Sequence, residues 1–95
     1  MVSDLSALWP TSSNAAPIRE CGQLTHRHAF NITTRNVSCR EARRVVRRWN
    51  HTVARRGGTG RVRGLYCRYR DTGYEAGDIR CTGSRRRVVR WQTGS

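Results

Sequence analysis

Four cysteines, Cys21, Cys39, Cys67 and Cys81, are spread through a chain of 95 residues with no close pair among them. Zinc sites built from cysteine usually take two ligands roughly two to four residues apart, so that one turn presents both. The cysteines are therefore expected to form two disulfide bonds, each of which would stabilise a small domain by about 2 to 4 kcal/mol. We therefore expect an exported, disulfide-bonded domain without metal or cofactor. The alternative is four free thiols in a reducing cytosol.

The first twenty residues differ in composition from the rest. Pro10 and Pro17 flank a Thr-Ser-Ser-Asn-Ala-Ala stretch that has neither helical nor strand periodicity. The segment lacks the basic start and the apolar run of a secretory signal, although its small residues resemble the end of one. We expect residues 1–20 to be a flexible segment, the remnant of a leader or a linker, and residues 21–95 to form one small domain. No apolar run is long enough to span a membrane.

The chain carries a formal net charge of +13, and all of its 19 basic residues are arginine. Two interpretations stay open. Codon usage in a GC-rich genome replaces lysine by arginine without regard to function. Alternatively, the planar guanidinium is used to recognise phosphate or carboxylate, for which its fork of donors is better suited than an ammonium group. Under either interpretation, a sequence pI near 11.6 predicts salt-sensitive attraction to polyanions.

The clearest local signal is a capping box at Ser38 and Glu41, in which each side chain accepts a hydrogen bond from the other residue's backbone N–H. It predicts a helix that starts at Cys39 and ends at Gly57-Gly58. The apolar residues of this segment recur at steps of three and four and form one stripe. They are Cys39, Ala42, Val45, Val46, Trp49 and Val53, and arginines occupy most other positions.

Alternation of apolar and polar residues predicts strands on both sides of the helix. The first covers 29–35 and places Phe30, Ile32 and Thr34 on one face; the others cover 63–70, 78–82 and 86–91. We expect an α+β fold with the order strand, helix and three-stranded meander, in which the helix packs on one face of a small antiparallel sheet. The residues expected in the shared core are Val46, Trp49, Leu65, Ile79 and Val89.

Four cysteines allow three disulfide pairings, and spacing alone does not choose among them. Cys39, Cys67 and Cys81 all point into the expected layer between helix and sheet. We favour Cys39 with Cys81 and Cys21 with Cys67. A Cys67–Cys81 bond is the alternative, and it requires the two residues to be neighbours across a hairpin centred near residue 74.

The expected solvent face of the meander combines arginines with an aromatic residue. Its residues are Tyr66, Arg68, Arg70, Arg80, Arg86 and Arg90. Such a face can bind single-stranded nucleic acid or another polyanion through stacking and charge. It is also what a solvated sheet face looks like in an arginine-rich chain. No nucleophile, base and orienting acid form a candidate set, so we expect no enzymatic activity.

Asn31, Asn36 and Asn50 each start an Asn-x-Ser/Thr triplet, the acceptor pattern for N-glycosylation. The pattern is inert in bacteria, and the third triplet lies on the predicted helix. We treat all three matches as chance.

Four segments, CGQL, NITTRNVSCREARRVV, RGLYCRY and DIRCTGSRRRVVRW, together resemble a family of small secreted four-cysteine actinobacterial domains of unknown function. The resemblance covers residues 21–91 and includes all four cysteines. It departs from the family at Leu65, where an aromatic residue usually follows Gly64, and in lacking a visible signal peptide. The resemblance implies export and a disulfide-bonded α+β module, but no activity and no site residues.

The function expected from these features is that of an extracytoplasmic, non-enzymatic binding or accessory domain. Its arginine-rich surface would contact an anionic polymer or an acidic protein. Two alternatives stay open: an intracellular nucleic-acid-binding protein, and a secreted enzyme inhibitor. The oligomeric state is not specified by the sequence.

Overall fold

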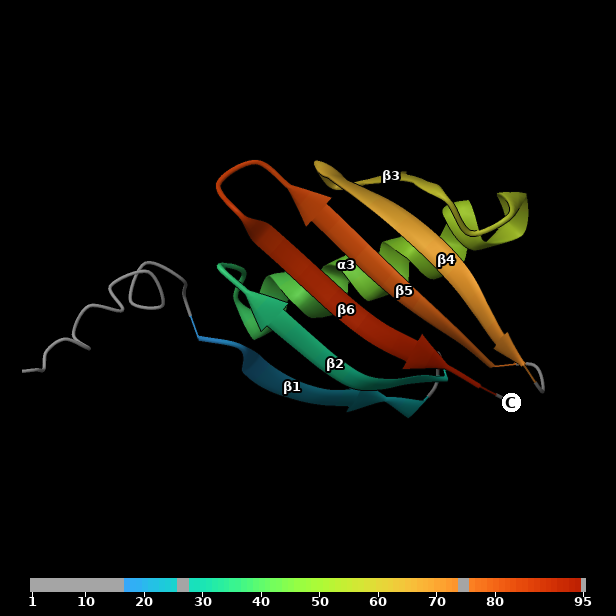
Figure 1. Cartoon of the computed structure of the whole chain (residues 1–95), viewed down its shortest axis with the longest axis horizontal. Helices are drawn as coiled ribbons and strands as arrows, with labels where there is room; N and C mark the ends of the chain where they lie inside the picture. Colours follow the sequence, from blue (N-terminus) through green and yellow to red (C-terminus); the bar gives the residue numbers. More distant parts are fainter. Residues whose placement is uncertain (1–16, 26–27, 74–75, 95) are drawn as a thin grey trace, which may run out of the picture.

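The computed structural model describes residues 17–25, 28–73 and 76–94, which form one helix packed on one antiparallel sheet (Figure 1). Six strands make up the sheet in the order β1-β2-β6-β5-β4-β3. The elements are β1 (Arg19–Leu24), β2 (Ala29–Arg35), α3 (Cys39–His51), the 3-10 turn η2 (Val53–Arg56), β3 (Gly60–Val62), β4 (Leu65–Gly73), β5 (Ala76–Gly83) and β6 (Arg87–Thr93). The α+β class and the antiparallel sheet are confirmed, but the fold is richer in strands than expected.

Helix α3 starts where the capping signal places it. The backbone N–H of Glu41 donates to Ser38 Oγ at 3.1 Å, and the buried side chains include Val46 and Trp49. The helix ends earlier than expected, at His51, because the Thr52 hydroxyl donates to the Arg48 carbonyl at 2.7 Å and the backbone then tightens into η2. Gly57, at φ 96°, closes η2 rather than the helix itself.

Two strands were absent from the sequence-based expectation. Strand β1 begins at Arg19, before the expected domain start at residue 21, and has two register shifts around Gly22, whose φ is 82°. These bulges remove the regular alternation by which a strand is recognised. Strand β3 has only three residues, Gly60–Val62, which is too short to display a period.

A bulge also changes the faces of β2. Asn31 has a φ of 53°, and the pairing with β6 shifts between Phe30 and Thr33. Ala29 and Ile32 are therefore buried, whereas Phe30 is only half-buried. The expectation that Phe30 lies on the same face as Ile32 was wrong, because one residue in a left-handed conformation inverts the alternation before it.

Three of the predicted strands begin at different residues from those expected: β5 begins earlier, at Ala76, and β4 and β6 begin later, at Leu65 and Arg87. Arg63 and Gly64, at φ 48° and 86°, form the turn between β3 and β4. Arg86, at φ 58°, lies in the turn before β6. The side-chain amide of Asn36 donates to the Arg85 and Arg86 carbonyls of that turn, and Asn31 donates to Gln92 Oε1 at 2.6 Å. Asn31 and Asn36 thus have structural roles.

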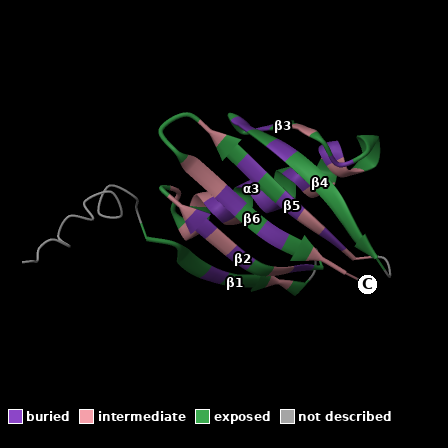
Figure 2. Cartoon of the chain, viewed as in Figure 1, coloured by how far each residue is buried: buried purple, intermediate pink, exposed green. Residues whose placement is uncertain are grey.

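The core lies between α3 and the inner face of the sheet (Figure 2). Val46, Trp49, Leu65, Ile79 and Val89 are all buried there, as expected. The Trp49 ring meets the Trp91 ring edge-on with centroids 5.7 Å apart and stacks on the Tyr69 ring at 6.4 Å. The indole N–H donates to the Gly58 carbonyl at 3.0 Å. A Cβ on Gly58 would lie 2.6 Å from that of Tyr69, so glycine is required for this approach.

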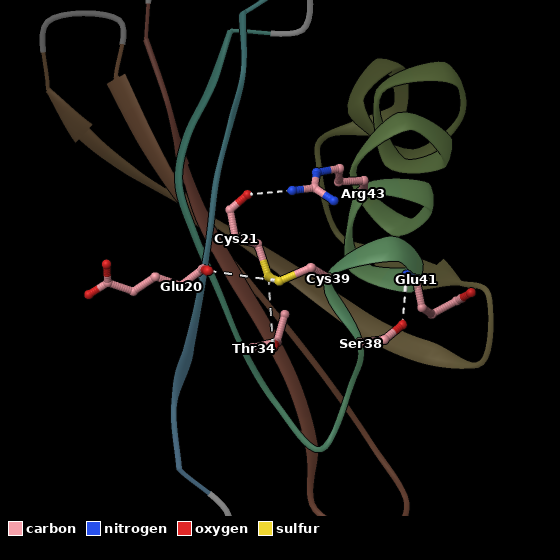
Figure 3. Close-up of a disulfide and its surroundings, with 7 residues drawn as sticks. All are labelled: Glu20, Cys21, Thr34, Ser38, Cys39, Glu41 and Arg43. Atoms are coloured by element: carbon pink, nitrogen blue, oxygen red, sulfur yellow. Dashed lines mark hydrogen bonds between the residues drawn. A yellow bond between two sulfur atoms is a disulfide. The ribbon is translucent and has the colours of Figure 1, made fainter.

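The disulfides join Cys21 to Cys39 and Cys67 to Cys81, so the favoured pairing was wrong. Cys67 and Cys81 are direct cross-strand partners in the β4–β5 ladder, which is the neighbour relation that their pairing requires. Cys39, in the first turn of α3, bonds to Cys21 on β1 with a Cα–Cα distance of 5.3 Å (Figure 3). Arg43 donates to the Cys21 carbonyl at 3.0 Å beside it. One bond therefore ties the helix to the sheet edge and the other lies within the sheet.

Tryptic mapping under non-reducing, acidic conditions tests this pairing. Cleavage after arginine separates all four cysteines, because an arginine lies between each pair. We expect peptide 20–27 linked to 36–40 and peptide 64–68 linked to 81–85. A linked pair of 36–40 with 81–85 in folded protein would contradict the structure.

Trp49→Ala tests the packing of α3. The substitution removes a buried ring that contacts two other aromatic rings, and we expect a loss of about 3 to 5 kcal/mol in the free energy of unfolding. Arg47→Ala, on the exposed side of the same helix, should change it by less than about 0.5 kcal/mol. Denaturant unfolding measures both. Equal losses would mean that the helix is rotated from the orientation described.

Candidate polyanion-binding face

The outer face of the sheet, the one that faces away from α3, carries a row of arginines. Arg68 on β4 pairs with Arg80 on β5, and Arg80 pairs with Arg90 on β6. All three are exposed, and adjacent strands lie about 4.8 Å apart. The same row continues through Thr33 on β2 to Glu20 on β1. We call Arg68, Arg80 and Arg90 the arginine row.

One carboxylate is placed among these arginines. Asp78 lies on β5 two residues before Arg80 and opposite Arg70 on β4. Its Oδ2 atom is 3.4 Å from Arg70 Nη2 and 3.8 Å from Arg90 Nη2. Within the described residues, Arg68 and Arg80 have no ion-pair partner. Of the three arginines of the row, Arg68 and Arg80 are therefore neutralised less than Arg90.

Tyr66 lies beside the arginine row. It pairs with Arg61 on β3 and with Thr82 on β5, and its side chain is 44% exposed. Arg61 belongs to this face and was missed from the sequence, because β3 is too short to show a period. Arg86 was expected on the face but lies in the turn before β6. The remaining predicted residues, Tyr66, Arg68, Arg70, Arg80 and Arg90, lie on one continuous surface.

The surface is a shallow, open depression of about 770 Å³ rather than a closed pocket. Arg68, Arg70, Asp78, Arg80 and Arg90 line it, together with Tyr69 and Thr82. Figure 1 looks onto this face and shows α3 behind the sheet, with no described element in front of it. Such a surface can take an extended anionic chain lying across the strands, and it has no enclosed site for a small molecule.

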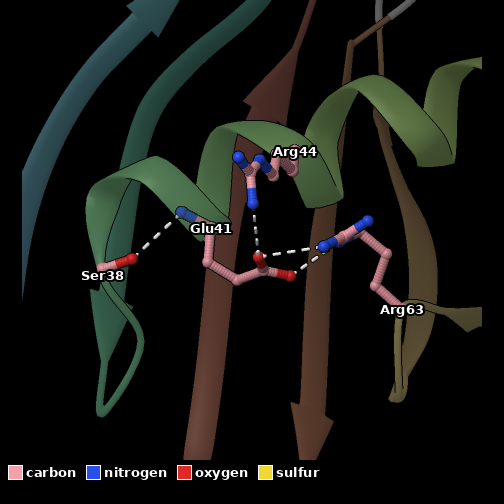
Figure 4. Close-up of polar contacts among 4 residues, drawn as sticks. All are labelled: Ser38, Glu41, Arg44 and Arg63. Atoms are coloured by element: carbon pink, nitrogen blue, oxygen red, sulfur yellow. Dashed lines mark hydrogen bonds and ion pairs between the residues drawn. The ribbon is translucent and has the colours of Figure 1, made fainter.

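The carboxylate of Glu41, in the first turn of α3, has a structural role. Glu41 accepts from Arg63 Nε at 2.7 Å and from Arg63 Nη2 at 3.1 Å, and Arg44 lies 3.9 Å away (Figure 4). The hydrogen bond from Arg63 lowers the pKa of Glu41 below its ordinary value, against the opposing effect of partial burial. The same contact raises the pKa of Arg63. This pair fixes the start of α3 to the β3–β4 turn.

Comparison of the chain with protein-family models, curated proteins and solved structures finds no match to any of them. Across residues 17–25, 28–73 and 76–94, no three potential metal ligands gather into a group. In the same part of the chain, no helix combines the length and the apolar character that crossing a membrane requires.

Removing the middle arginine of the row should stabilise the fold. Like charges directly opposite on neighbouring strands are destabilising, so Arg80→Thr is expected to raise the free energy of unfolding by about 0.2 to 1 kcal/mol at low salt. The gain should shrink as salt is added, because salt screens exposed charges. Arg35→Thr on the same face, opposite Val88, is the control and should gain less. An unchanged or lower stability for Arg80→Thr would show that the row carries no net repulsion.

Proposed function

We propose that this chain is a non-enzymatic, extracytoplasmic binding domain that holds an acidic polysaccharide across the outer face of its sheet. The observation that carries the proposal is the arginine row, in which Arg68, Arg80 and Arg90 are direct cross-strand partners. A row of like charges costs folding free energy unless an anion neutralises it. Repeated carboxylate, sulfate or phosphate groups on one polymer supply that neutralisation at several arginines together.

The two disulfides support an oxidising compartment as the place of action. Disulfides persist in secreted and periplasmic proteins and are rare in the cytosol. The polymers met by a domain in such a compartment include acidic polysaccharides of the cell envelope. An accessory role beside other envelope components agrees with the resemblance to small secreted four-cysteine domains.

The composition of the face favours a polysaccharide over single-stranded nucleic acid. Proteins that bind single strands combine charge with several aromatic side chains on which successive bases stack. Among the described residues, Tyr66 is the most exposed aromatic residue beside the arginine row. Tyr69 also lines the depression, but its ring stacks on Trp49, and Phe30 on β2 is half-buried. Nucleic acid remains the second candidate because Tyr66 lies next to Arg61, Arg68 and Arg80. If these arginines bound the phosphates of a single strand, one of its bases could stack on the Tyr66 ring.

Asp78→Asn provides a gain-of-function test. It frees Arg70 and Arg90 from an internal carboxylate, so we expect dextran sulfate to bind several-fold more tightly at moderate salt. Asp71→Asn is the matched control: it makes the same charge change on β4, at a position that alternates to the other side of the sheet. Titration of labelled polymer measures both. Equal gains would mean that charge count alone acts, and the proposed site would be wrong.

Tyr66→Ala separates the two candidate partners. Loss of a stacked base should weaken single-stranded DNA binding by about 1 to 3 kcal/mol, with a loss that persists at high salt. We expect a smaller loss and a steep, similar salt dependence for DNA and dextran sulfate, because counterion release supplies the free energy. A large, salt-resistant effect on DNA alone would favour nucleic-acid recognition.

A further inference from the structure

A second basic surface lies on the solvent side of α3, and it faces away from the arginine row. Its members are Arg40, Arg44, Arg47 and Arg48, which we call the helix stripe, and all are exposed. We propose that the domain uses both surfaces together and bridges two stretches of acidic polysaccharide. This rests on the proposed function, since the outer face must hold the first stretch.

Helix geometry sets the direction of the helix stripe. At about 100° per residue, Arg40, Arg44 and Arg47 lie within one narrow sector of the helix. The buried residues of α3 are Ala42, Val45, Val46 and Trp49. Their sector is centred roughly opposite the stripe. Because the buried sector packs on the inner face of the sheet, the stripe points away from the sheet.

The two basic surfaces therefore look in opposite directions across one helix-on-sheet layer. Figure 1 views the outer face with α3 behind the sheet, so the helix stripe lies on the far side. A stiff polymer segment that lies across Arg68, Arg80 and Arg90 does not reach Arg40 or Arg47 unless it bends around a sheet edge. Two separate segments are needed to occupy both surfaces.

The helix stripe remains charged because its local carboxylate is taken by another element. Glu41 is the one acidic residue of α3. Arg63, from the β3–β4 turn, binds both of its carboxylate oxygens, and only Arg44 of the stripe lies within ion-pair distance (Figure 4). Arg40, Arg47 and Arg48 have no ion-pair partner among the described residues.

Arg43 shows the difference between a structural and an available arginine on the same helix. It is half-buried and donates to the Cys21 carbonyl at 3.0 Å, next to the Cys21–Cys39 disulfide (Figure 3). Within the described part of the chain, the stripe residues make no comparable bond to the backbone of another element. Arginines spaced four apart on one helix repel each other, and a bound polyanion relieves that repulsion.

A two-polymer capture experiment tests bridging. Biotinylated dextran sulfate is immobilised sparsely, the domain is bound and excess is washed away, and fluorescent dextran sulfate is then added. We expect wild-type protein to retain the fluorescent polymer in proportion to the protein bound. Adding unlabelled dextran sulfate in excess with the fluorescent polymer should compete with this retention.

Three variants of equal net charge localise the second contact. The helix variant carries Arg40→Gln, Arg47→Gln and Arg48→Gln, since glutamine keeps helix propensity. The sheet variant carries Arg68→Gln, Arg80→Gln and Arg90→Gln. The scattered variant carries Arg19→Gln, Arg55→Gln and Arg85→Gln, on three other parts of the chain. Circular dichroism and thermal unfolding check that each variant is folded.

The helix variant should bind the immobilised polymer within about threefold of the scattered variant but capture at least tenfold less fluorescent polymer per protein bound. The sheet variant should bind the immobilised polymer more weakly than either. Equal second capture by the helix and scattered variants would overturn bridging by α3. The sheet variant keeps the helix stripe, so its second capture is the decisive reading for the outer face. First binding and second capture by the sheet variant that both equal those of the scattered variant would overturn the proposed function, so the two failures are distinct.

Discussion

Burial of one stripe of α3 is the constraint on which the rest of the structure depends. Trp49 is its centre: it meets Trp91 from β6 and Tyr69 from β4, and it donates to the Gly58 carbonyl. These contacts decide which face of the sheet is covered. Once Leu65, Ile79 and Trp91 point inward, the alternate residues of the same strands must point to solvent. The arginine row is thus positioned by the core on the opposite side of the sheet.

The sequence predicted those parts that depend on neighbours along the chain. Ser38 and Glu41 located the start of α3, and alternation on β4 to β6 placed Arg68, Arg80 and Arg90 on one face. Features set by backbone conformation were missed. Asn31 adopts a left-handed conformation that reverses the faces before it, and Gly22 breaks the alternation of β1. Neither residue type forces such a bulge, so a periodic pattern does not reveal it.

Strand register explains why the favoured disulfide pairing was wrong and why the sequence did not show which arginines face each other. Alternation places Cys67 and Cys81 on the same face but does not say that they are opposite each other. The β4–β5 ladder makes them partners, and the same register, one position on, brings Arg68 opposite Arg80. Cys39 then pairs with Cys21, which lies on β1, a strand that the sequence patterns did not show. The register between two strands depends on the geometry of the turn that joins them, and the alternation of residues within each strand does not specify that geometry.

The arrangement of charges has a common physical logic on both faces. Carboxylates are few, and two of them are already paired with arginines within the fold. Glu41 binds Arg63 and so holds the β3–β4 turn to α3, and Asp78 lies between Arg70 and Arg90. The arginines left over are grouped by the fold rather than dispersed, which lowers stability by repulsion. The disulfides offset this cost without adding charge, because they act mainly by restricting the unfolded chain. A small covalently linked core can therefore carry two dense basic surfaces that a core of this size would otherwise support less well.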